Sequence, residues 1–156
     1  MLILYSVSWD AGRNALVMRT PFGKDVTMAK QPVGGSQPGG SYSPGIVAEG
    51  RFVYVSGQGP FRDEVLTGTG IEEQTRVTLG NLAAVLESAG ASLADVVRCG
   101  VFLADVRDFA AMDKVYAATF PQPLPARTTV GAAFPVPGML VEIDCVAVLP
   151  STGQPG

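Results

Sequence analysis

The stretch PARTTVGAAFPVPGMLVEID, residues 125–144, decides how we interpret the rest of the chain. It holds one Arg, Arg127, and one Glu, Glu142, on two β-like segments joined by a Pro- and Gly-rich loop. Alternate residues of a strand share a face, so Arg127 lies with Thr129, and Glu142 lies with Asp144. If the two segments pair, Arg127 and Glu142 can face a common cleft. We therefore expect them to be neighbouring strands of one sheet.

The composition fits one domain and argues against nucleic acid as a partner. A chain of 156 residues, 47% of them hydrophobic, can bury a packed core. Its 11 Lys and Arg against 14 Asp and Glu give a net charge of -3, so no basic field gathers phosphates. Because only 16% of residues are charged, we expect subunits to bury part of the neutral surface.

The chain has no His, which removes the commonest general base and metal ligand. Cys99 and Cys145 lie in apolar runs without metal-ligand spacing, so we interpret them as inert core thiols in a reducing cytosol. We expect no metal and no cofactor. Chemistry then falls to Arg, carboxylates, Tyr, Ser and the backbone.

Residues 1–39 are interpreted as an N-terminal extension and linker, and residues 40–150 as the domain. The apolar opening is too short to span a bilayer and lacks the basic start of a secretory signal, so we expect no membrane partner. The runs 2–9 and 15–19 allow a hairpin, although a spurious or disordered extension fits equally well. Residues 29–41, rich in Gly, Pro, Ser and Gln, are predicted to be a flexible linker.

The remaining pattern predicts an α+β domain, with a mostly antiparallel or mixed sheet and two helices on one face. Glu49 and Gly50 are predicted to form the turn between the first two strands. Thr69 and Glu72 are predicted to cap the first helix as a capping box. Strands are expected over residues 46–48, 52–56, 96–103, 126–130 and 140–149, and helices over residues 71–89 and 106–120.

In the second helix, Phe109, Met112, Tyr116 and Phe120 form a stripe that we assign to the core. After the first helix, Ser92 and Asp95 are predicted to cap a short turn.

Arg127 admits two interpretations. Its planar guanidinium suits a carboxylate ligand, but an internal ion pair with Glu142 or Asp144 is a common structural alternative. Glu142 can orient or deprotonate a water if it lies within hydrogen-bond reach of a site. Tyr42 can close a cleft, whereas Ser56 has no base beside it to make it a nucleophile.

Several stretches together resemble the Rid family, also called the YjgF family, and in particular its RidA-like members. They are SYSPGIVAEGRFVYVSGQGP, GIEEQTRVTLGNLAAVLESAGASLADVVRCGVFLADVRDFAAMDKVYAATF and PARTTVGAAFPVPGMLVEIDCVAVL. The resemblance covers about residues 40–149 nearly without gaps. It implies a chorismate-mutase-like α+β protomer in a homotrimer, with ligand clefts between subunits.

The resemblance also implies an activity: hydrolysis of reactive imines and enamines, such as 2-aminoacrylate and 2-iminopropionate, to 2-oxo acids and ammonia in the cytoplasm. By that likeness Arg127 would bind the substrate carboxylate and Glu142 would act on the water. Tyr42, Thr129, Ser56 and Gly57 would line the cleft. A trimer that binds small carboxylates or a partner protein without turnover is the alternative, and a ribonuclease is a third class that the acidic balance and missing His oppose.

The chain departs from the RidA pattern at three places. Asp113 stands where RidA-like proteins usually have Asn, which puts a negative charge near an anionic substrate. Gly59 replaces a branched apolar residue and the loop 61–67 is short, so a wider pocket is expected. The loop 131–137 is also atypical. Because of its position in the RidA pattern, we expect Asp113 to be a substrate-binding residue.

Overall fold

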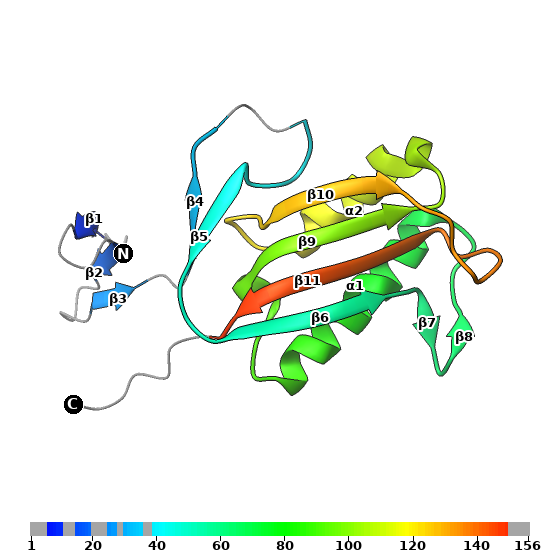
Figure 1. Ribbon diagram of the computed structural model, residues 1–156, viewed down its shortest axis with the longest axis horizontal. Helices are drawn as coiled ribbons and strands as arrows, with labels where there is room; N and C mark the ends of the chain where they lie inside the picture. Colours follow the sequence, from blue (N-terminus) through cyan, green and yellow to red (C-terminus); the bar gives the residue numbers. More distant parts are fainter. Residues whose placement is uncertain (1–5, 11–14, 20–24, 28–29, 36–38, 150–156) are drawn as a thin grey trace, which may run out of the picture.

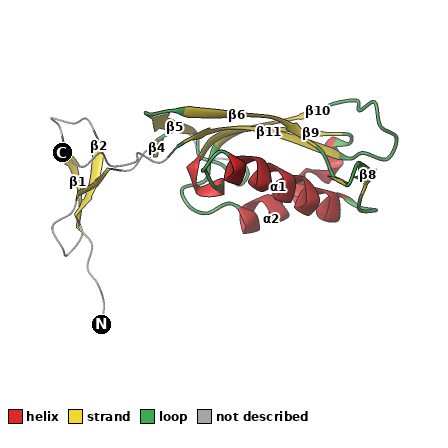
Figure 2. Ribbon diagram, turned by 90° about the horizontal axis from the view of Figure 1, so that it is seen from below, coloured by secondary structure: helices red, strands yellow, loops and turns green. Residues whose placement is uncertain are grey.

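The computed structural model describes residues 6–10, 15–19, 25–27, 30–35 and 39–149. A four-stranded mixed sheet in the order β10-β9-β11-β6 organises the domain (Figure 1). Its helices, α1 and α2, lie together on one face of the sheet (Figure 2). This arrangement confirms the predicted α+β class. The bounds are β6 Phe52–Gln58, β9 Val96–Leu103, β10 Ala126–Gly131, β11 Val141–Val148, α1 Ile71–Ser88 and α2 Phe109–Thr119.

The core fills the space between the sheet and the two helices. Leu79, Leu82 and Leu86 recur at the spacing that places apolar residues on one face of α1, and each is 1% exposed or less. On β11, Ile143 and Cys145 point toward them, while the residues between face the other way. Burial of these side chains holds the helices on the sheet.

The expectation that the Arg127 and Glu142 strands pair is wrong. β9 lies between them, parallel to β10 and antiparallel to β11. A parallel pair needs a crossover connection, and α2 is the element that carries the chain from β9 to β10. β10 therefore forms one edge of the sheet and β6 the other.

Outside the main sheet, β1 Ser6–Asp10, β2 Ala15–Arg19 and β3 Asp25–Thr27 form a three-stranded antiparallel sheet. The hairpin predicted there is confirmed for β1 and β2, while the start of its first run lies outside the described residues.

The linker prediction fails over β4, Lys30–Val33, which pairs with β5, Gly45–Ala48. Lys30 is buried, and its Nζ donates a hydrogen bond to the Val96 carbonyl at 2.7 Å, so this segment is fixed to the domain. Residues 29 and 36–38 of the predicted linker lie outside the described residues.

Two local predictions are corrected. β5 and β6 are not partners, because β5 pairs with β4 and β6 pairs with β11. The N-cap of α1 is Gly70 without a side-chain cap; Glu73 accepts the Thr69 N–H at 3.2 Å, while Glu72 instead pairs with Arg76.

The Ser92–Asp95 capping box is confirmed at the short 3-10 turn Leu93–Asp95. The second predicted helix is divided into a 3-10 turn, Val106–Asp108, followed by α2. The chain between β6 and α1 forms a small hairpin of β7, Phe61–Arg62, and β8, Val65–Leu66. The Phe61 ring lies only 2.6 Å from where a Cβ at Gly59 would stand, so the phenyl ring occupies the room that this glycine leaves. No described helix is long and apolar enough to cross a membrane.

Candidate functional site

The Arg127 side chain lies on the helix side of edge strand β10. In the parallel ladder Arg127 is opposite Cys99, a fully buried residue of the core. Its guanidinium Nη1 lies 2.6 Å from Oδ1 of Asp113 on α2, and the Arg127 side chain is only 1% exposed. The cation is therefore sealed inside one protomer and already has an acidic partner.

Three aromatic rings enclose the guanidinium. Its Cζ lies 4.6 Å from the ring centre of Tyr116 and 5.4 Å from those of Tyr42 and Phe109. Phe109 and Tyr116 come from the α2 stripe assigned to the core, and Tyr116 is indeed fully buried. Rings at this distance attract a cation through their negative faces. The α2 stripe thus packs in the core and also contacts the Arg127 guanidinium.

The segment 39–43 covers this cluster from the outside. Ser41 donates to the Asp113 carboxylate through both its backbone N–H, at 3.1 Å, and its hydroxyl, at 2.9 Å. A Cβ at Gly40 would come within 2.9 Å of Arg127 Nη2, so only glycine lets the backbone pass this close. The Ser43 N–H donates to the Pro125 carbonyl at 3.0 Å and ties the segment to the start of β10.

Asp113 is held in its ionised form. Burial opposes ionisation, but the hydrogen bonds from Arg127 and Ser41 outweigh it, so the pKa of Asp113 lies below its ordinary value. Two other polar atoms of the cluster, Nη2 of Arg127 and Oγ1 of Thr129, are buried and have no hydrogen-bond partner within the described part of the chain. An unpartnered buried donor is costly, which marks this cluster as a place where a ligand group can be accepted.

Glu142 lies on the opposite face of the sheet. Its neighbours Val141 and Ile143 are fully buried toward the helices, so Glu142 points away from them. A Cβ at Gly57 would stand 2.2 Å from Oε1 of Glu142, which means that the carboxylate lies directly over the Gly57 backbone. Only a glycine on β6 leaves room for it.

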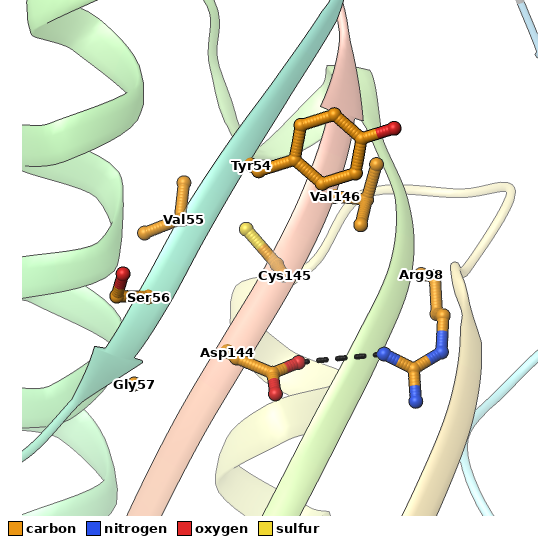
Figure 3. A pocket seen from close by; sticks show the side chains of 8 residues that line it. All are labelled: Tyr54, Val55, Ser56, Gly57, Arg98, Asp144, Cys145 and Val146. Atoms are coloured by element: carbon orange, nitrogen blue, oxygen red, sulfur yellow. Dashed lines mark hydrogen bonds and ion pairs between the residues drawn. The ribbon is translucent and has the colours of Figure 1, made fainter.

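A shallow pocket on this open face adjoins Gly57 (Figure 3). An ion pair crosses it, with Nη1 of Arg98 at 3.5 Å from Oδ1 of Asp144, and the Gly100 N–H also donates to Asp144. The lining residues are Tyr54, Val55, Ser56, Gly57, Arg98, Asp144, Cys145 and Val146.

The structure therefore divides the predicted site residues into two groups. The arginine half-site brings together Tyr42, Asp113, Arg127 and Thr129 on the helix side. The glutamate half-site, Ser56, Gly57 and Glu142, lies on the open face. Within one protomer, Arg127 and Glu142 do not share a cleft, and the anticipated ion pair of Arg127 with Glu142 or Asp144 does not form because Asp113 takes that place.

Sequence reasoning missed three members of the arginine half-site. Phe109 and Tyr116 were assigned to the core alone, and nothing in the pattern separates a core aromatic from one that also contacts a cation. Ser41 lies in the predicted linker. Its signal was the adjacent Gly39-Gly40 pair, which allows a close backbone approach.

The two cysteines are free and buried in the core, as expected. Burial raises the pKa of both thiols to about 12, which keeps them protonated and unreactive. Within the described ranges, no group of three or more His, Cys, Asp or Glu side chains is arranged to hold a metal ion.

Residues 35–149 match the family described as Endoribonuclease L-PSP. Among curated proteins, the chain is 44% identical over 126 residues to mitochondrial protein mmf2 of Schizosaccharomyces pombe, covering 77% of this chain and 98% of that one. It is 41% identical over 114 residues to a RutC family protein of Pyrococcus horikoshii, covering 71% of this chain and 89% of the relative.

Solved structures give the same likeness. A Rid family protein of unknown function, YyfB from Yersinia pestis, superimposes with a TM-score of 0.72 at 26% identity, covering 78% of this chain and 100% of that one. RidA from an Antarctic Psychrobacter bacterium superimposes with a TM-score of 0.60 at 37% identity, covering 72% of this chain and 92% of that one.

Proposed function

We propose a function from one premise: the chain belongs to the endoribonuclease L-PSP family, which includes the Rid and YjgF proteins. In this proposal it is a hydrolase of carbon–nitrogen bonds that converts 2-imino acids, and the enamines in equilibrium with them, to 2-oxo acids and ammonia. The observation that carries the proposal is the sealed Arg127, whose buried Nη2 has no hydrogen-bond partner among the residues that the structure describes. A small carboxylate supplies the acceptor that this donor lacks.

The two half-sites meet, in this proposal, across the boundary between protomers of a homotrimer. Arg127 belongs to edge strand β10, and Glu142 projects from the open face of the sheet. An edge of one protomer packed against the open face of the next would join the two groups.

Exposed apolar residues support such a contact. On strand β6, Phe52 is 46% and Tyr54 77% exposed, and on β10, Val130 is 44% exposed. Apolar side chains gathered on the face and edge of a sheet are typical of surfaces that a partner covers. The low charged fraction of the chain points the same way.

The proposed chemistry needs only positioning and proton transfer. Arg127 holds the substrate carboxylate while Glu142 of the partner subunit accepts a proton from a water, whose oxygen bonds to C2 as the C=N π electrons move to nitrogen. The protonated Glu142 returns that proton to the nitrogen, which gives the carbinolamine. The carbinolamine then expels ammonia: Glu142 takes the hydroxyl proton and passes it to the nitrogen, the C2–N bond breaks, and C2=O forms. One water is consumed, and no oxidant or metal is required.

A subunit-mixing experiment tests this function and the shared site together. Arg127→Ala and Glu142→Gln chains are expected to release 2-oxo acid from a dehydratase-generated imine about 1,000-fold and about 100-fold more slowly than the wild type, respectively. When the two variants are unfolded together and refolded as mixed trimers, about a quarter of the sites regain both groups, and activity returns in proportion. Full activity of Arg127→Ala alone would refute the proposed function, whereas inactive mixed trimers would refute the shared site.

A second candidate follows from Asp113, which already occupies Arg127. In that case the trimer binds a small carboxylate or a partner protein at the same cleft without turnover. A 2-oxo acid found bound in a protein that hydrolyses none of a panel of imines would select this candidate. The family description names a ribonuclease, but a chain without His and with a net charge of -3 lacks the usual means to bind and cleave RNA, so we do not propose that activity.

A further inference from the structure

The charges of the arginine half-site cancel. Among the described residues, Asp113 is the one acidic side chain paired with Arg127, at 2.6 Å, and aromatic rings lie around the guanidinium. The Asp113 side chain is 18% exposed, so part of it remains accessible to solvent while Arg127 is closed in. A ligand that approaches this half-site meets a paired cation and anion rather than a bare positive charge.

The pair also limits what Arg127 can offer. Nη1 donates to Asp113, and Nη2 is buried with no partner in the ranges that the structure describes. A carboxylate ligand therefore gains one free guanidinium nitrogen in place of the two that make a bidentate pair. It gains this contact once segment 39–43 moves off Nη2, because the Gly40 backbone lies against that atom.

A simple anion is poorly matched to such a site. Its carboxylate would lie near Asp113, and two like charges at short range repel strongly where water is excluded. A ligand that carries a cationic N–H beside its carboxylate gains a second contact and avoids this repulsion. Its carboxylate accepts from Nη2 while its N–H donates to Asp113. Asp113 accepts four hydrogen bonds, three from Ser41 and one from Arg127, so the ligand N–H takes the place of a Ser41 donor once segment 39–43 moves.

We propose that Asp113 makes the arginine half-site a receptor for small zwitterions, with a carboxylate and a protonated nitrogen on the same carbon, in preference to simple carboxylate anions. Resting on the function proposed above, this assigns the protonated iminium form of a 2-imino acid as the bound substrate. An iminium carbon is more electrophilic than that of a neutral imine. The 2-oxo acid product has no cationic nitrogen, so the same contact that favours the substrate speeds product release.

Two stable probes with the same carbon skeleton test the inference: L-alanine, a zwitterion, and pyruvate, an anion. Their dissociation constants are measured by calorimetry or by ligand-observed NMR at pH 7. We expect the wild-type protein to bind alanine at least about ten-fold more tightly than pyruvate. Asp113→Asn, which retains an acceptor for Ser41, is expected to shift that ratio by about ten-fold or more toward pyruvate.

Asp105→Asn is the matched control, because Asp105 also pairs with an arginine, Arg107, but does so at the exposed surface. In Asp105→Asn the ratio of the alanine and pyruvate dissociation constants is expected to equal that of the wild type. Wild-type binding of pyruvate as tight as that of alanine overturns the inference, as does an unchanged ratio in Asp113→Asn or binding of neither probe. If the variant does not fold, the wild-type ratio decides. These measurements need no turnover, so a selective protein without hydrolase activity would refute the proposed function and leave this inference standing.

Discussion

The arginine half-site and the glutamate half-site lie on opposite faces of one sheet, and the fold encloses them to different degrees. Arg127 is 1% exposed, ion-paired, surrounded by aromatic rings and covered by segment 39–43. Glu142 lies over a bare glycine backbone on the face that no helix covers. The comparison teaches that the fold of one chain encloses the arginine side of the sheet and leaves the glutamate side open, which is the division of labour that the proposed function assigns to them.

Among the predicted variants, Arg127→Ala should have the largest effect, on both stability and activity. Removing the guanidinium leaves Asp113 as an uncompensated, largely buried charge, so we expect a loss of about 3 kcal/mol in the free energy of unfolding. Release of 2-oxo acid should fall by about 1,000-fold because the substrate loses its positioning group. Urea denaturation and a 2-oxo acid assay measure the two effects. Undiminished stability would mean that the Arg127–Asp113 pair does not hold the half-site together.

Glu142→Gln should affect activity alone. The carboxylate has no buried ion partner among the described residues, so the free energy of unfolding should change by no more than about 0.5 kcal/mol. Loss of the proton acceptor should lower the turnover rate by about 100-fold. The same two assays apply, and a large loss of stability here would remove the contrast between the half-sites.

Gly57→Ala should disturb the glutamate half-site by steric overlap. The new Cβ would stand 2.2 Å from Oε1 of Glu142, so the carboxylate must move, and we expect about a ten-fold fall in the turnover rate. Gly80→Ala on α1 is the control, since a Cβ there meets nothing within 4 Å. The control should keep full activity and gain about 1 kcal/mol in helix stability. Equal losses of activity in both variants would contradict the assigned position of Glu142.

The smallest expected effect is a pH dependence confined to the arginine half-site. Because the folded-state pKa of Asp113 is lowered, its pair with Arg127 contributes fully above the ordinary Asp pKa of about 3.9 and is lost as pH falls through the lower folded value. The stability difference between wild type and Asp113→Asn, followed by urea denaturation, should therefore shrink below pH 4. A difference that stays constant down to pH 2 would show that Asp113 carries no charge in the folded protein.

The sequence predicted the strands and helices of the domain well, because apolar periodicity reports directly on burial. The residues 96–103 were predicted as a strand and form β9 with those bounds. Pairing was harder. The α2 crossover makes β10 a parallel neighbour of β9, and β11 pairs with the other side of β9. Parity along one strand says nothing about which strand lies beside it.

The candidate site was predictable residue by residue but not in its arrangement. The motif containing Arg127 and the departure at Asp113 were both recognisable, yet their mutual ion pair depends on how α2 packs under β10. The aromatic rings around Arg127 carried no separate signal, because helical spacing accounts for Phe109 and Tyr116 as core. Ser41 was hidden in a segment whose composition is typical of linkers.

Segment 39–43 has one more consequence, for chemical modification. Dicarbonyl reagents that attack guanidinium groups should react faster with Arg107, which is 88% exposed, than with Arg127, which is 1% exposed. The rate at which Arg127 is labelled then reports how often the segment lifts. A cell rich in reactive carbonyl compounds would spare the arginine on which the proposed function depends.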